Sequence, residues 1–157
     1  GRLREEARRR GVAEDRLVFA KRASLADHLA RHQLADLFLD TFPFGAHTTG
    51  WHALLAGLPF ITIRGESFAS RVSASLLASA SLAELAVASL EEYEALARAL
   101  AVAPDRLAAF RRRLQEAHAT APLFDGERYR RHLEAAYITM HQRALEGKAP
   151  ADFDVPV

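Results

Sequence analysis

The residues best suited to chemistry form the segment Phe44-Gly45-Ala46-His47-Thr48-Thr49-Gly50, which follows a short apolar run and opens a helical pattern. The first amides of a helix have no partner within the helix, and the helix dipole places positive charge at that end. Threonine hydroxyls can add donors around an anionic oxygen, and glycine lets the backbone approach a ligand closely. The segment therefore favours a bound phosphate, although threonine and glycine at a helix start also serve plain capping.

The spacing of two histidines is compatible with metal binding. His28 and His32 lie one helical turn apart, as the histidines of a zinc-binding HExxH helix do, but Leu29 stands where the glutamate base belongs and no third ligand is evident. A partly exposed polar helix face is the favoured interpretation, and no metal is expected. His47 and His52 flank the phosphate segment, where each is either a ligand contact or a histidine satisfied within the core.

The remaining polar residues give little support to other functions. Serine is frequent between residues 67 and 89, but no Gly-x-Ser-x-Gly turn surrounds any serine, so nucleophilic catalysis is not supported. The arginine clusters 8–10 and 111–113 lie in helical stretches that also carry acidic residues, which is typical of solvated faces. The 157 residues include 21 basic and 20 acidic side chains, and a net charge of +1 provides no global field for nucleic acid or an anionic membrane. Any bound anion must be held locally.

The elements that must position these residues alternate between strand and helix patterns. Helices are predicted over 2–10, 25–33, 48–56, 67–80, 90–100, 104–117 and 128–145, and strands over 16–20, 37–39, 60–63 and 85–87. Short strand–helix–strand units require parallel strands and right-handed crossovers, so the pattern predicts an α/β fold. Parallel sheets bind ligands at the carboxyl ends of their strands, which is where the phosphate segment falls.

Two features bear on the cellular compartment. Residues 41–63 contain no Asp, Glu, Lys or Arg, but prolines, glycines, threonines and histidines interrupt them, which favours a buried unit over a membrane span. Cysteine is absent, which excludes disulfides and thiolate metal sites and fits a reducing compartment, so we expect a cytoplasmic protein. The chain begins at Gly1 without an initiator methionine or an apolar leader, which indicates a piece of a longer protein with no secretion signal.

Six segments occur in the order known from one family: 34–41 (LADLFLDT), 45–50 (GAHTTG), 56–59 (AGLP), 68–72 (FASRV), 91–97 (EEYEALA) and 121–124 (APLF). They resemble the C-terminal catalytic lobe of the O-linked N-acetylglucosamine transferases and their bacterial and SPINDLY-type relatives. The resemblance implies a Rossmann-like lobe of a GT-B glycosyltransferase over 1–120, a parallel sheet flanked by helices, with its first strand upstream of residue 1. It further implies a C-terminal helix over 121–148 that packs on the lobe, and a tail over 149–157.

The resemblance also implies a function. A UDP or GDP sugar, foremost UDP-N-acetylglucosamine, would donate its sugar to serine or threonine of an acceptor protein. No metal or other cofactor is required, and the implied catalytic histidine belongs to an N-terminal lobe, so no catalytic residue is expected here. That lobe and tetratricopeptide repeats are expected in the same parent chain, which leaves this piece inactive alone. The implied nucleotide-binding residues are Ala23, His28, Arg31, His47, Thr48, Thr49, Gly50 and His52.

Each implied contact has a distinct role. His28 would pack against the base with Arg31 beside it, and backbone groups at Ala23 would meet the base edge. Residues 47–50 would hold the diphosphate, in agreement with the chemistry of a helix N-terminus.

Two positions depart from the family pattern. His52 stands where the family has an aspartate that hydrogen-bonds the ribose, and a histidine cannot be the same two-oxygen acceptor. Leu25 replaces a family lysine. These departures fit one alternative, a non-catalytic GT-B-like interaction domain. The other alternative is a GT-B transferase with a non-protein acceptor. In either case the apolar face of the last helix, with Leu133, Tyr137 and Met140, is expected to be partly uncovered.

Overall fold

Helices and short strands alternate along the chain, as the sequence predicts. The computed structural model describes residues 1–155, and no helix within that range is both long and apolar enough to cross a membrane. The elements, with η for short 3-10 helices, are α1 (Arg2–Arg9), η1 (Glu14–Arg16), α2 (Leu25–His32), β1 (Phe38–Leu39), α3 (Thr48–Leu55), β2 (Phe60–Ile63), α4 (Phe68–Ser79), η2 (Ala83–Leu85), β3 (Ala86–Val87), α5 (Leu90–Ala101), α6 (Pro104–Thr120), η3 (Pro122–Phe124) and α7 (Gly126–Leu145).

The strands form a three-stranded parallel sheet in the order β1-β2-β3. Phe38 pairs with Phe60, and Thr62 pairs with Ala86. Because α3 joins β1 to β2 and α4 joins β2 to β3, each parallel pair is connected by a helix. The predicted α/β fold and the strands over 37–39, 60–63 and 85–87 are therefore confirmed.

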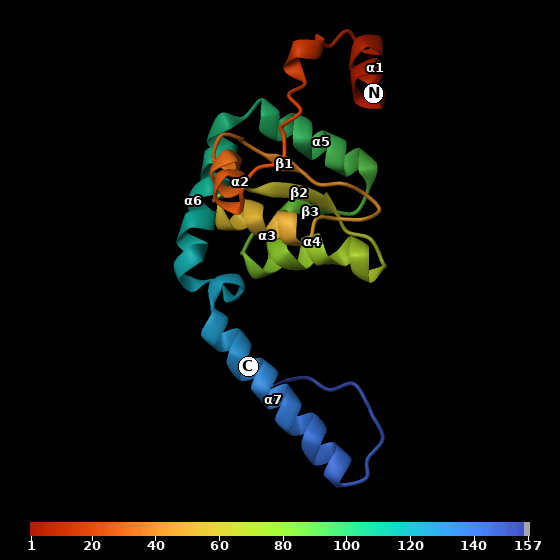
Figure 1. The fold of residues 1–157 in the computed structure, drawn as a ribbon, viewed down its shortest axis with the longest axis vertical. Helices are drawn as coiled ribbons and strands as arrows, with labels where there is room; N and C mark the ends of the chain where they lie inside the picture. Colours follow the sequence, from red (N-terminus) through yellow and green to blue (C-terminus); the bar gives the residue numbers. More distant parts are fainter. Residues whose placement is uncertain (156–157) are drawn as a thin grey trace.

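Helices cover both faces of this sheet. In Figure 1, α5 lies on one side of the strands, and α3 and α4 lie on the other. All four residues of β2 are buried, as expected for a central parallel strand covered on both faces. The core consists of side chains from the strands and the helices around them: Leu54, Phe60, Ile61, Leu77, Ala80, Leu82, Leu85, Leu100, Phe110 and Leu114.

Several helices begin at a residue whose side chain accepts the backbone N–H three positions later. These N-caps are Ser24, Ser67, Ser89 and Asp125. Such caps satisfy one of the amides that a helix start leaves open. The helix α3 differs, because the side chain of its N-cap residue His47 makes no such bond.

The strand predicted over 16–20 is absent, and this prediction was wrong. Residues 14–16 form η1 and the chain then continues without regular structure to Ser24. Val18 is 87% exposed and Phe19 is 54% exposed. A strand needs a neighbouring strand to accept its backbone hydrogen bonds, and among residues 1–155 the sheet contains only β1, β2 and β3. The apolar composition of the run is therefore not sufficient to make it a strand.

The sheet and the helices α2 to α6 around it form what we call the sheet-bearing unit. The last helix, α7, extends away from this unit (Figure 1). It meets the rest of the chain mainly at η3, and none of its residues is buried. Leu133, Tyr137 and Met140 are exposed, as predicted. The expected packing of this helix on the lobe is thus not seen along most of its length, because its apolar stripe has no facing surface in residues 1–155. The tail turns back beside the helix, where Arg143 donates to the carbonyl of Ala149.

Candidate functional site

The N-terminus of α3 is open toward solvent at the carboxyl end of β1. Thr48 and Thr49 are exposed, and no side chain caps this helix. The first-turn amides have no partner within the helix, so they and the two hydroxyls can converge on an anionic oxygen. Gly50 is buried, and a Cβ there would lie 3.3 Å from a methyl carbon of Leu76. A side chain at this position would therefore require the Leu76 methyl to move by a few tenths of an ångström, and glycine lets the helix start pack on α4 without that shift.

The turn before α3 is tied to α4. The amide of Gly45 donates to the carbonyl of Ala69 at 3.2 Å, and Nε2 of His47 lies 3.3 Å from the same oxygen. The hydroxyl of Ser73 donates to the carbonyl of Ala46 at 2.7 Å. These bonds attach the residues ahead of α3 to the neighbouring helix α4, so the open amides belong to a fixed structure.

Aromatic rings surround His47. The ring of Phe44 stacks on it with centroids 4.9 Å apart, and the ring of Phe68 meets it edge-on at 6.1 Å. His47 is thus held in place by ring contacts as well as by its bond to α4. Phe44 and Phe68 are 64% and 80% exposed, so an apolar rim borders the open helix start.

The histidines of α2 and α3 meet beside this helix. The ring centroid of His28 lies 4.5 Å from that of His32 and 5.5 Å from that of His52. Arg31 donates to Nδ1 of His28 at 3.0 Å and to the carbonyl of Lys21 at 3.0 Å. His52 follows Thr48 by four positions and therefore shares its helix face. The two groups of predicted residues, one for the base and one for the phosphates, thus lie along one face.

Ala23, Leu25 and His52 are the remaining positions that the sequence analysis singled out near this site. Ala23 is exposed in the irregular segment that leads into α2, and Leu25 is 60% exposed at the start of that helix. Nδ1 of His52 is buried and has no hydrogen-bond partner among the described residues. The structure therefore leaves one buried polar atom without a partner among residues 1–155, at the position where the resemblance implies an aspartate.

Burial lowers the pKa of His28 below its ordinary value of 6.5, and positive charge on His32, Arg31 and His52 would lower it further. The Nδ1 atom that accepts from Arg31 must be unprotonated, so the observed geometry belongs to neutral His28. Because the folded pKa lies below the unfolded one, the stability contributed by this arrangement is present above pH 6.5 and is lost as the pH falls through the folded pKa.

We expect Arg31→Ala to raise the pKa of His28, since the substitution removes both a positive charge and the donor that requires the neutral ring. An NMR titration of the ring protons measures this pKa directly. Arg130→Ala is the matched control, because Arg130 pairs with Glu127 and Glu134 on α7. An unchanged or lowered His28 midpoint in Arg31→Ala would contradict the assigned hydrogen bond.

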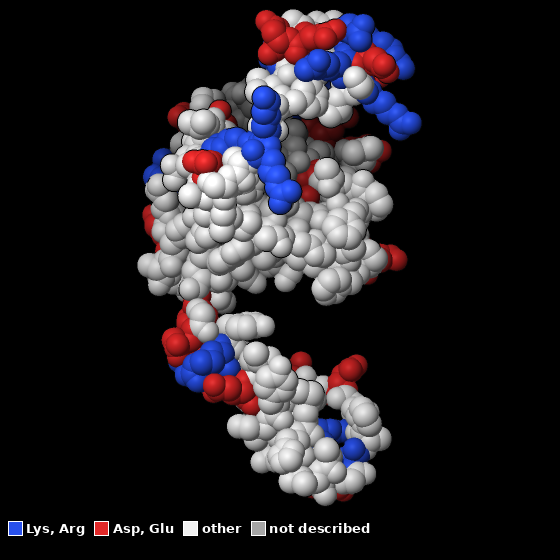
Figure 2. All heavy atoms as spheres, in the orientation of Figure 1, with Lys and Arg blue, Asp and Glu red and all other residues white. Residues whose placement is uncertain are grey.

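Charged side chains are unevenly distributed. Figure 2 shows them gathered on α1, on the start of α7 and on the upper part of the sheet-bearing unit, where Lys and Arg side chains lie, while the lower part of this face is largely uncharged. Residues 41–63, which carry the phosphate segment, contribute no Asp, Glu, Lys or Arg to that face. An anion at α3 would therefore be bound by amides and hydroxyls, in agreement with the local binding that the net charge requires.

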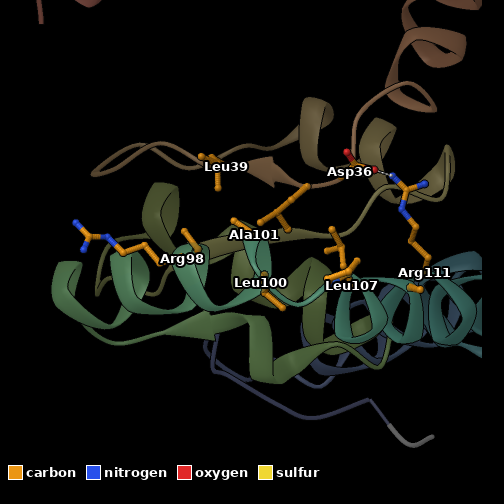
Figure 3. Close-up of a pocket in the computed structure, with 11 residues that line it drawn as sticks. Asp36, Leu39, Arg98, Leu100, Ala101, Leu107 and Arg111 are labelled. Carbon is orange, nitrogen blue, oxygen red and sulfur yellow. Dashed lines mark ion pairs between the residues drawn. The ribbon is translucent and has the colours of Figure 1, made fainter. Parts of the chain in front are cut away.

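A second cavity lies away from the start of α3. A groove of about 790 Å³ runs between β1 and the helices α5 and α6, with Leu39, Leu100 and Leu107 in its wall (Figure 3). An ion pair between Arg111 and Asp36, 3.9 Å apart, closes one end. Apart from this ion pair and Arg98 the lining is apolar, and it contains no histidine, serine or second carboxylate to act beside Asp36, so the groove has no catalytic set of residues. In the part of the chain that the structure describes, no group of three or more His, Cys, Asp or Glu residues is placed to hold a metal ion.

Sequence reasoning missed one residue of this site. Asp40 is buried beneath the turn, where its carboxylate accepts from the amide of Ala46 at 2.7 Å. A signal was present, because Asp40 ends a strand and is the last charged residue before the uncharged segment 41–63. That position predicts a carboxylate at the carboxyl end of the sheet, and its burial follows only from the packing of the turn.

A parallel sheet with helices on both faces and an open helix start at the carboxyl end of a strand is a Rossmann-like lobe, and the likeness to a solved glycosyltransferase reported below makes it one of the GT-B type. Comparison with known proteins identifies the particular family. The family model for "Glycosyl transferase family 41" matches residues 1–133, and the chain belongs to this family.

Individual relatives agree. The chain is 39% identical over 155 residues to the "Probable UDP-N-acetylglucosamine–peptide N-acetylglucosaminyltransferase SEC" of Arabidopsis thaliana, covering 98% of this chain and 16% of that protein. It is 35% identical over 145 residues to the Caenorhabditis elegans UDP-N-acetylglucosamine–peptide N-acetylglucosaminyltransferase, covering 92% of this chain and 13% of that protein. A solved Thermobaculum terrenum O-GlcNAc transferase mutant superposes with a TM-score of 0.85 at 33% identity, over 94% of this chain and 28% of the other. The chain thus spans a small part of each relative's length.

Proposed function

We propose that the chain is the donor-nucleotide-binding lobe of a protein O-glycosyltransferase, which transfers N-acetylglucosamine from UDP-N-acetylglucosamine to serine or threonine of an acceptor protein. Membership of family 41 and the names of the relatives support the reaction class. The observation that carries the proposal is the open N-terminus of α3, with Thr48 and Thr49 exposed at the carboxyl end of β1.

In such a reaction the leaving group is a nucleoside diphosphate, whose phosphate oxygens gain negative charge as the sugar departs. Fixed amides and hydroxyls directed at those oxygens stabilise that charge without having to reorganise. We assign this role to His47, Thr48, Thr49 and Gly50. The ties between the preceding turn and α4 support the assignment, because they hold the donors in place before the ligand arrives.

We assign the nucleoside to the neighbouring cluster. His28 would stack on the base, with Arg31 orienting its ring, and the exposed backbone at Ala23 would meet the base edge. His52 would lie beside the ribose. Its contact with His28 and its place one turn after Thr48 support a site that is continuous from base to diphosphate. No metal ligand is required in this scheme.

The proposal extends to the protein that carries the chain. Residues 1–120 would form the nucleotide-binding lobe, with the helical segment 121–148 and the tail 149–157 following it. The parent protein would be cytoplasmic and bacterial and would also carry an N-terminal lobe and tetratricopeptide repeats; the small share of each relative's length that the chain spans supports its greater length. Within that protein, α7 would find a facing surface for its exposed apolar stripe.

The direct test is transfer and hydrolysis of UDP-N-acetylglucosamine by the full-length protein that carries this chain, beside its His52→Asp variant. We expect transfer to an acceptor protein by both forms, because His52 lies at the ribose and not at the reacting bond. The substitution is expected to change the KM for the donor more than kcat, since it replaces a ring nitrogen by two acceptor oxygens.

One observation favours a second candidate, a non-catalytic interaction domain. Nδ1 of His52 is buried without a hydrogen-bond partner among residues 1–155, at the position where the resemblance implies a ribose-binding aspartate. If neither form acts on any UDP or GDP sugar, and neither binds the corresponding nucleotide in calorimetry, the interaction domain replaces the transferase. Sugar transfer to a lipid or small molecule, with none to protein, would instead indicate a GT-B enzyme with a non-protein acceptor.

A further inference from the structure

The buried carboxylate of Asp40 lies directly beneath the turn that leads into α3. Asp40 is 7% exposed and is the only buried acid among residues 1–155. No ion pair of the described residues includes it, so its charge is compensated by neutral donors. Burial of a carboxylate without a cation is unfavourable unless several hydrogen bonds reach it, so the residues around Asp40 must supply those bonds.

Both carboxylate oxygens are occupied. Oδ1 accepts from the amides of Thr41 and Ala46, each at 2.7 Å, and Oδ2 accepts from the hydroxyl of Thr62 at 2.7 Å. These short bonds to an ionised acceptor are stronger than bonds between neutral groups. With its oxygens engaged within the fold, Asp40 is neither placed to bind a metal ion nor free to take a proton from a substrate.

The backbone of Asp40 is also held. The hydroxyl of Tyr93, a residue of α5, donates to the backbone carbonyl of Asp40 at 2.8 Å. Burial and the charge of Asp40 raise the pKa of Tyr93 to about 12, so this hydroxyl remains a donor at neutral pH. A Cβ at Gly45 would lie 3.1 Å from Oδ2 of Asp40 and 2.7 Å from the hydroxyl of Ser73, so the turn approaches this network as closely as a glycine allows.

We propose that Asp40 is the positioning residue of the phosphate-binding turn, and this inference rests on the proposed function. Its carboxylate draws the amide of Ala46 inward, while Ser73 holds the carbonyl of the same residue. With both polar groups of Ala46 fixed inside, the chain enters α3 at one angle, and the next amides, from Thr48 onward, face the ligand. Asp40 therefore acts on the diphosphate through geometry, without touching it.

The test compares UDP with uridine, which lacks the diphosphate. In the full-length protein, we expect Asp40→Ala to weaken UDP binding about tenfold, in line with the loss of a charge-assisted hydrogen bond, and to leave uridine binding unchanged. Asp40→Asn is the conservative variant. Its amide oxygen can accept from both backbone amides and its NH2 can donate to the Thr62 hydroxyl, so we expect UDP affinity to return close to that of the unmodified protein. Calorimetry for UDP and ligand-observed NMR for uridine provide the two affinities.

Each result decides a different question. Equal losses of UDP and uridine affinity in Asp40→Ala, or no recovery in Asp40→Asn, would overturn the positioning role. If Asp40→Ala does not fold, Asp40→Asn and Ser73→Ala decide, and Ser73→Ala should weaken UDP alone because it frees the carbonyl of Ala46. If the unmodified protein binds UDP no more tightly than uridine, the proposed phosphate site itself is wrong. GDP and guanosine, run in parallel, cover a guanine donor.

Discussion

The Thr48→Ala, Thr49→Ala double variant of the full-length protein is expected to bind the donor nucleotide about 100-fold more weakly. Both hydroxyls are exposed at the open start of α3, where each can donate to a phosphate oxygen. A hydrogen bond to a charged group contributes about 1.5–3 kcal/mol, so the loss of two amounts to roughly 3 kcal/mol, or about 100-fold in affinity. Calorimetric titration with UDP measures the loss.

The matched control makes the same two threonine-to-alanine substitutions at positions away from the proposed site. Thr120 on α6 and Thr139 on α7 donate to carbonyls within their own helices, so Thr120→Ala, Thr139→Ala removes two hydroxyls away from α3. We expect this control to bind UDP as the unmodified protein does. Unchanged affinity and turnover in the Thr48, Thr49 variant would refute the phosphate role of these residues. Because alanine is a better helix former than threonine, helix propensity predicts no loss of thermal stability in either double variant.

Phe60→Ala is expected to destabilise the 157-residue chain by about 3–5 kcal/mol, a large share of the roughly 5–15 kcal/mol that holds a typical domain. Phe60 is fully buried in the central strand, and its ring lies 5.7 Å from that of Phe38 on the neighbouring strand. Its Cε1 is also 3.5 Å from the point where a Cβ on Gly50 would lie. The cavity would therefore open beneath the first turn of α3. Urea unfolding followed by circular dichroism measures the change.

Phe68→Ala is the control for this experiment, because it removes the same ring from a residue that is 80% exposed. Its expected effect on unfolding is below about 1 kcal/mol, because it loses only the edge-on contact with His47 at 6.1 Å. Similar destabilisation by both variants would show that the sheet and its flanking helices do not form the main cooperative core.

The elements that the sequence predicted well are those specified by neighbouring residues. Ser24 and Ser67 begin helices because a hydroxyl three residues before an amide can cap it, and the apolar residues 60–63 form a strand that any parallel sheet would bury. The phosphate segment belongs to the same class. Its threonines and glycines open a helix after a strand, and the structure leaves that helix start without a cap.

Contacts between distant residues were decided only by the tertiary structure. Asp40 and Thr62 are 22 positions apart, and Tyr93 reaches Asp40 across 53, so no local pattern could place them in one network. The same reason explains the failure at 16–20: a strand exists only where another strand pairs with it, whatever its own composition.

The helix α7 likewise combines a feature set by neighbouring residues with one set by distant contacts. The sequence predicted a helix over 128–145 with an apolar face, and the structure begins it two residues earlier, at Gly126, with Asp125 as its cap. Where that face lies depends on which surfaces are present to cover it, and within residues 1–155 it stays exposed. The amino-acid sequence by itself determined the elements and the chemistry at the start of α3, because hydrogen bonding and periodicity act over a few residues. Packing decided which of those residues meet, because burial and pairing require partners far along the chain.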